Sequence, residues 1–270
     1  MEKKYKLTDE TIRVNRTNLY RIEALRNFSN VYKGDKGGFV ESEDNLSHDG
    51  DCWIYDDAIV YGNARVSGNA RVFSKARIFN NARVSDNARV YGEADIFCNA
   101  EVYGNAQVGG RAIICDRAKL YENAKIFNNA KVYGNAKIYG SAKLYSTAEV
   151  SGNAQVCGYT ELCGIAIIKG NAKIKSDSDY IIFKNWWSSG RFFIWTRSNN
   201  KWLVGCFYGT GKELIEKAYK DSELSGREYE RVVNYAESIL QEKRVKKPSK
   251  IVKYFRRFCI YRLLQKRQRR

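Results

Sequence analysis

The chain has 270 residues, of which 44% are hydrophobic, 13% are aromatic and only one is proline. This composition excludes a disordered or low-complexity chain, and the length is enough for about two domains. The net charge of +17 is concentrated at one end, because residues 243–270 hold 13 of the 47 Lys and Arg and no acid. Residues 1–242 therefore carry 34 basic and 30 acidic groups, a net charge of +4.

The cysteines and the histidine do not form a metal-binding pattern. There are seven cysteines without a C-x-x-C pair, and one histidine. We therefore predict no metal site and reduced thiols. The first residues contain no apolar run typical of a signal peptide, and no segment reaches the roughly 18 apolar residues of a membrane helix. We expect a cytoplasmic protein.

Residues 1–51 precede the regular part of the sequence, and we predict that they form an irregular N-terminal cap. They contain the single histidine, His48. If the register of the following repeats is carried back from Ile54, His48 falls at an inward position, as a capping residue would.

Residues 52–175 repeat every six positions. Alanine recurs at every sixth residue from Ala58 to Ala172, with Thr160 as the exception, and Val, Ile or Leu stands two residues after each of these 20 positions. Such a period indicates a solenoid, in which each repeat buries its apolar side chain against its neighbours. Gly-Asn pairs such as Gly62-Asn63 mark the corners, because both residue types readily adopt left-handed backbone conformations.

An aliphatic residue followed four positions later by a small one resembles the hexapeptide-repeat superfamily. This resemblance implies a left-handed parallel β-helix with three hexads per coil, hence about seven coils here. The NARVYG form of the repeat is similar to that of uncharacterised bacterial and phage proteins, some of which are labelled as acetyltransferases. In those relatives a leader like residues 34–40 and 46–58 precedes the repeats, and a GCF-x-GT segment, here residues 205–210, follows them. The resemblance implies acetyl-CoA as a cofactor and His48 as the catalytic base of an acetyltransferase.

Stacking every eighteenth residue sorts the outward side chains onto three faces. The first face combines cations such as Lys119 with Tyr103, Tyr121 and Tyr139, and the second face, which includes Lys125 and Phe127, is similar. Alternating aromatic and basic residues are compatible with a stacking platform for single-stranded nucleic acid or a sugar polymer, and also with ladders that only stabilise the strands. The third face is the most apolar, and we predict that it binds a partner or a second copy through Ile59, Phe79, Phe97, Ile113, Tyr133 and Ile167.

Residues 176–242 lack the six-residue period of the repeats, and we predict that they form a small α+β cap. Two strand-like runs flank the turn signal Ser198-Asn199-Asn200, which predicts a hairpin or small meander. Thr210 and Ser225 each begin an S/T-x-x-E capping box, so we expect helices at about 212–221 and 226–242. The Gly-rich start of the first helix is also compatible with a phosphate site, but it lacks the full Walker spacing.

Residues 243–270 form a basic tail with apolar residues at three- and four-residue steps after Pro248, as in an amphipathic helix. This tail is expected to bind nucleic acid, an anionic membrane surface, or only the neighbouring cap domain. The candidate polyanion-binding residues are Lys246, Lys247, Lys250, Lys253, Arg256, Arg257, Arg262, Lys266, Arg267, Arg269 and Arg270.

The sequence thus predicts a mainly β protein whose most favoured function is that of a non-enzymatic scaffold or binding protein without a cofactor. The resemblance adds a phage association. The alternative function is an acyl-CoA-dependent transferase, for which His48 is the one available base.

Overall fold

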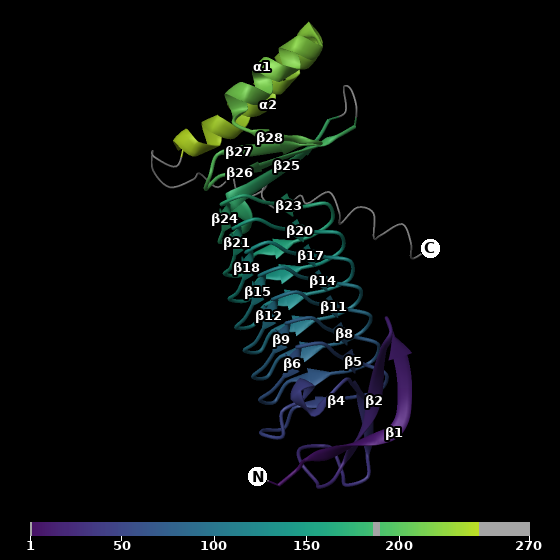
Figure 1. Cartoon of the computed structure of the whole chain (residues 1–270). Coiled ribbons are helices and arrows are strands. Elements are labelled where there is room, and N and C mark those ends of the chain that lie inside the picture. The colour runs from purple at the N-terminus through teal and green to yellow at the C-terminus, as the bar shows by residue number, and fades with distance from the viewer. Residues whose placement is uncertain (1, 186–189, 243–270) are drawn as a thin grey trace, which may run out of the picture. The chain divides into compact units, whose positions relative to one another are not determined.

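The computed structural model describes residues 2–185 and 190–242, and the chain divides into two compact units, residues 1–179 and 180–270 (Figure 1). The tail residues proposed to bind polyanions, together with Trp186 and Trp187, lie outside the described residues. Each unit is treated separately below.

The first unit is a parallel β-solenoid built from two-residue strands. The first face consists of β6 (Arg65–Val66), β9 (Arg83–Val84), β12 (Glu101–Val102), β15 (Lys119–Leu120), β18 (Lys137–Ile138), β21 (Gln155–Val156) and β24 (Lys173–Ile174). The second face consists of β4 (Trp53–Ile54), β7 (Arg71–Val72), β10 (Arg89–Val90), β13 (Gln107–Val108), β16 (Lys125–Ile126), β19 (Lys143–Leu144) and β22 (Glu161–Leu162). The third face consists of β5 (Ile59–Val60), β8 (Arg77–Ile78), β11 (Asp95–Ile96), β14 (Ile113–Ile114), β17 (Lys131–Val132), β20 (Glu149–Val150) and β23 (Ile167–Ile168).

The pairing confirms three hexads per coil. Val60 pairs with Ile78, Ile78 with Ile96, and Ile96 with Ile114, so residues 18 apart are neighbours in one sheet. The inward aliphatic residues and the corner alanines are at most 1% exposed, because each is covered by the equivalent residue of the next coil. Thr160 fits the alanine position because its hydroxyl donates to the carbonyl oxygen of Cys157 at 2.8 Å.

The corners work differently from the prediction in one respect. Only the first residue of each Gly-Asn pair has a positive φ, for example 67° at Gly62. In the next coil Asn80 takes the place of this glycine, and its φ is 58°. The second residue instead joins a ladder of side-chain amides, in which Asn63 Nδ2 donates to Asn81 Oδ1 at 3.0 Å.

The leader is more regular than predicted. It forms the antiparallel pair β1 (Tyr5–Val14) and β2 (Thr17–Ala24), then β3 (Lys36–Val40) and the 3₁₀ helix η1 (Glu43–Asn45). Because β3 pairs in parallel with β5, and Leu46 bridges to Val66, the leader contributes a turn of its own and the solenoid has about eight turns.

The backbone hydrogen bonds that flank the two-residue strands all run in one direction between coils, which influences how the two ends of the solenoid are completed. Backbone N–H groups donate to carbonyls of the following coil, as from Arg65 N to Ala82 O at 3.0 Å. The first turn therefore leaves carbonyls without a coil beneath them, and donors satisfy several of these: Tyr5 Oη donates to Leu46 O at 2.8 Å, and Lys4 Nζ to Cys52 O at 3.0 Å. At the other end acceptors are required, and Asp179, in η2 (Asp177–Asp179), accepts from Lys175 N at 2.8 Å.

The second unit is an antiparallel sheet with two helices. Its strands are β25 (Tyr180–Lys184), β26 (Phe192–Thr196), β27 (Lys201–Val204) and β28 (Phe207–Gly209), and its helices are α1 (Gly211–Asp221) and α2 (Glu223–Glu242). Phe193, Trp195 and Trp202 form its core with residues of both helices. Within the described part of the chain, neither helix has the length and apolar character required to cross a membrane.

The helix starts test the two predicted capping boxes. Thr210 is the N-cap of α1 as predicted, since its hydroxyl accepts from Glu213 N at 3.3 Å and its N–H donates to Glu213 Oε2 at 2.7 Å. The capping box predicted at Ser225 is wrong, because α2 already begins at Glu223. Ser222 Oγ accepts from Ser225 N at 3.1 Å and satisfies the first turn instead.

Candidate interaction surfaces

The third face carries an aromatic ladder over its first three coils. The rings of Tyr61 and Phe79 stack with centroids 5.2 Å apart, and those of Phe79 and Phe97 with centroids 4.9 Å apart. Ile113 and Cys115 continue the face as half-buried side chains. The next coil adds Tyr133, whose hydroxyl lies 3.4 Å from Glu149 Oε2. Ile167, on the last strand of this sheet, is also half-buried.

The charges on the third face are paired with one another between adjacent coils. Arg77 contacts Asp95 through two hydrogen bonds, of which the Nε–Oδ1 bond is 2.6 Å. This contact with the carboxylate raises the pKa of the Arg77 guanidinium. Lys131 Nζ lies 3.9 Å from Glu149 Oε1. At these positions the face therefore has no net charge, and its remaining surface is largely apolar.

The N-terminal hairpin covers the start of the third face. Ile59 is only 7% exposed because it packs with Leu19 and Phe39, with Ile12 and Val14 alongside. The prediction that Ile59 contributes to a partner surface is therefore wrong, since the chain's own β1–β2 hairpin already occupies it. The open part of the face begins with the coil of β8.

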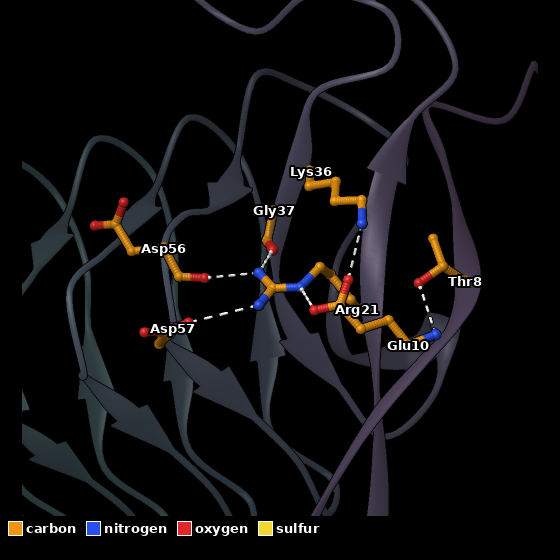
Figure 2. A network of polar contacts seen from close by, with 7 residues as sticks. All are labelled: Thr8, Glu10, Arg21, Lys36, Gly37, Asp56 and Asp57. Carbon is orange, nitrogen blue, oxygen red and sulfur yellow. Dashed lines mark hydrogen bonds and ion pairs between the residues drawn. The ribbon is translucent and has the colours of Figure 1, made fainter.

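A polar network fixes this hairpin to the first turn (Figure 2). The Arg21 guanidinium donates to Glu10 Oε1 at 2.6 Å and to the carbonyls of Gly37 and Asp56 at 2.8 and 3.2 Å. Lys36 Nζ donates to the second carboxylate oxygen of Glu10 at 2.9 Å. These two hydrogen bonds lower the pKa of Glu10, with that from Lys36 the larger cause.

The sequence contained a signal for the hairpin that the prediction missed. Two alternating runs, residues 11–14 and 17–24, flank Asn15-Arg16, and both of these residues have positive φ, 46° and 71°. Two such residues between alternating strands are typical of a type I′ hairpin turn. Arg16 is an unusual residue for this turn, which weakened the pattern.

The first face does not offer open ring surfaces at the centre of its tyrosine ladder. Tyr103 stacks on Tyr121 at 5.2 Å and 5°, and Tyr121 on Tyr139 at 5.0 Å and 1°. Because each ring covers its neighbour, the central rings expose edges, whereas a nucleobase or sugar ring stacks on an open π-face. The ladder geometry therefore favours strand stabilisation over a stacking platform.

The first and second faces carry the excess positive charge of the solenoid. Arg65, Arg83 and Lys137 on the first face, and Arg89 and Lys125 on the second, make no ion pair with another described residue. A shallow trough of about 410 Å³ lies beside the second face, between Gln107, Lys125 and Tyr159. A second trough of about 350 Å³ lies beside the third face, lined by Lys75, Arg77, Glu93, Asp95, Arg111 and Ile113.

His48 is held by structural contacts. Its Nδ1 accepts the backbone N–H of Lys4 at 3.2 Å, its ring stacks on Tyr5 at 4.5 Å, and its Nε2 lies 3.6 Å from Glu43 Oε2. Since the lone pair on Nδ1 is engaged, the neutral ring carries its proton on Nε2 and has no free basic nitrogen. His48 lines neither trough.

The inward position predicted for His48 belongs to another residue. Leu46 is 1% exposed and occupies the inward position six residues after Val40. The register prediction is wrong because two extra residues separate Leu46 from Ile54. Among the described residues, no group of three or more His, Cys, Asp and Glu could hold a metal ion.

One family model matches part of the solenoid. Residues 76–92 match the model described as the YdcK beta solenoid repeat, which covers about one coil. No curated protein matches the chain. The match agrees with the β-solenoid seen in the structure, and it extends over too little of the chain to assign a family.

Proposed function

We propose that this chain is a non-enzymatic β-solenoid scaffold that binds a protein surface through its third face. The observation that carries this proposal is the combination of half-buried apolar rows with charges that are neutralised within the face, Arg77 by Asp95 and Lys131 by Glu149. A face of this kind loses little charge solvation when it is covered, and it gains the burial of Phe97 and Ile113.

The substitution Ile113→Lys tests this function. A lysine at the centre of the face places an unpaired charge in the interface, so we expect loss of self-association or of partner binding, measured by light scattering after gel filtration and by pull-down. Gln155→Lys is the matched control, because it adds the same charge at the equivalent hexad position of the first face. If Ile113→Lys behaves as the wild type does, the third face is not the binding surface.

The competing function is an acetyl-CoA-dependent acetyltransferase, as the resemblance to the hexapeptide-repeat superfamily implies. The contacts of His48 favour a structural role, and the sequence contains no second histidine. We expect His48→Ala to leave any acetyl-CoA turnover of the purified protein unchanged. Turnover by the wild type that disappears in His48→Ala would establish the enzyme and replace the scaffold proposal.

We also propose that residues 243–270 bind nucleic acid or another polyanion, which rests on the 13 Lys and Arg in this segment. Truncation at Pro248 should abolish retention of RNA or DNA, and the affinity of the full chain should fall steeply with salt. Binding that is independent of salt, or that occurs only to anionic vesicles, would contradict a nucleic-acid role. Membership of the hexapeptide-repeat superfamily and a phage association remain parts of this proposal that rest on the resemblance.

A further inference from the structure

The charges of the third face follow a pattern that changes sign when it is reversed. Along the strands β8, β11, β14, β17 and β20 the outward residues are Arg77, Asp95, Ile113, Lys131 and Glu149. They are spaced by one coil, about 4.8 Å, so the row is about 19 Å long. Reading the row backwards about Ile113 exchanges each cation for an anion.

We propose that the third face pairs with the third face of a second copy of this chain, antiparallel and about a twofold axis at Ile113. This inference rests on the proposed function, because it names the partner of the same surface. The axis places Asp95 opposite Lys131 of the second copy, and Arg77 opposite Glu149 of the second copy. Each charge then keeps its partner within the chain and gains one across the interface.

The neighbouring row is compatible with the same axis. It consists of Phe79, Phe97, Cys115, Tyr133 and Ser151, one residue per coil. The axis brings Phe97 against Tyr133 of the second copy and Cys115 against Cys115 of the second copy. Aromatic and small apolar side chains therefore meet at the centre of an isologous interface.

Other registers bring like charges together. Moving the axis by half a coil toward the C-terminus places Asp95 opposite Glu149 of the second copy. Moving it by half a coil toward the N-terminus places Arg77 opposite Lys131 of the second copy. A parallel arrangement places each charge opposite itself. Because like charges in contact destabilise an interface strongly, the row selects the antiparallel register centred on Ile113.

The hairpin defines where the contact ends. It covers Ile59, so the open row begins at Arg77. Packed sheets cross at about 30°, so the ends of the two rows diverge from the axis and leave room for the hairpins outside the central contact. The five residues from Arg77 to Glu149 are thus the part of the face that two copies share.

A charge exchange tests this register in the full-length protein. Asp95→Lys alone and Lys131→Asp alone each place like charges across the axis, and we expect each to raise the dimer dissociation constant at least about tenfold in sedimentation equilibrium. The double variant with both changes restores opposite charges across the axis while breaking the pairs within each chain, so we expect a dissociation constant within about threefold of the wild type. Circular dichroism checks the fold, and exposed ion pairs contribute little to it.

The outcomes separate this inference from the proposed function. A double variant as weak as the single variants overturns the antiparallel register. If all three charge variants dimerise normally while Ile113→Lys does not, the third face binds, but in another register, and only this inference fails. If Ile113→Lys also dimerises normally, or if the wild type is monomeric at high concentration, the self-pairing fails.

Cysteine cross-linking gives a second test of the axis. A short bismaleimide should link two chains through Cys115, and the linked dimer should be lost in Cys115→Ser and retained in Cys98→Ser. Burial raises the pKa of the Cys115 thiol to about 11, so the reaction needs a long incubation at mildly alkaline pH. Because the exposed Cys206 would also react, both variants are made in a Cys206→Ser, Cys259→Ser background, in which a cross-link that survives Cys115→Ser would contradict the proposed axis.

Discussion

Asn45 shows how one side chain closes the first turn of the solenoid. It is fully buried, and its Oδ1 accepts from the backbone N–H groups of Glu41 and Ser42 at 3.1 and 2.9 Å. Its Nδ2 donates to the carbonyls of Gly62 and Ala64, both at 2.9 Å. Every hydrogen-bonding position of the amide is therefore used, and no other side chain of similar size has two donors and an acceptor in this arrangement.

We expect Asn45→Asp to destabilise the protein by at least about 1–3 kcal/mol at neutral pH, because a carboxylate would face two carbonyl oxygens. Burial and these carbonyls raise the pKa of the new carboxyl above its unfolded value. The lost stability should therefore be partly recovered as the pH falls and the group is protonated. Urea unfolding at neutral and at acidic pH measures the difference in the free energy of unfolding between the variant and the wild type. Asn135→Asp, in an exposed amide ladder, is the control, and an equal loss in both variants would contradict the argument.

At the scale of the elements, the 18-residue spacing made most of the solenoid predictable. Once three hexads form a coil, a pair such as Arg77 and Asp95 must lie in adjacent strands, and the structure confirms it. The leader was harder, because residues 5–14 contain a register shift between Leu7 and Thr11 that interrupts the alternation of the strand. Local capping patterns were ambiguous as well, since both Ser222 and Ser225 fit a helix start and only neighbouring structure decides between them.

The tyrosine ladder of the first face predicts a loss of stability in alkali. Burial raises the pKa of Tyr103 and Tyr121, and a hydrogen bond to Cys157 together with burial raises that of Tyr139 to about 12. Unfolded tyrosines ionise near pH 10, so between about pH 10 and 12 the unfolded state releases protons that the folded state retains. Stability is therefore full below about pH 10 and falls as the pH rises through this window.

Replacing Tyr103, Tyr121 and Tyr139 together by Phe should reduce this alkaline slope of the urea midpoint. The phenyl rings keep the stack while removing the ionisable groups, so stability at neutral pH should change little. Tyr159→Phe, at a side chain that is 87% exposed, serves as the control and should retain the wild-type slope. An unchanged slope in the triple variant would show that other groups govern the alkaline transition.

At the scale of the whole solenoid, stability and binding depend on different features of the repeat. Stability is the sum of contacts between adjacent coils, whereas a face exists only if every coil stays in the same rotational register. The sequence predicted which residues share a face because the 20 hexads contain no insertion between Ala58 and Ala172. It did not predict that the hairpin covers Ile59. The hairpin lies outside the six-residue repeat, so the repeat says nothing about which face the hairpin contacts.

Two deletions separate these features. Removing residues 155–172 takes out one coil and leaves the row from Arg77 to Glu149 intact, so the shortened chain should be less stable toward urea but should still self-associate. Removing residues 89–94 takes out a single hexad and changes only one coil junction, so it should cost less stability. Every later residue then moves by one face, however, so Ile113 leaves the third face and Lys119 takes its place, in a row that reads Arg77, Glu101, Lys119, Lys137 and Gln155. We expect this shorter deletion to abolish self-association, as measured by sedimentation. If it self-associates as the wild type does, the binding surface is not the continuous third face.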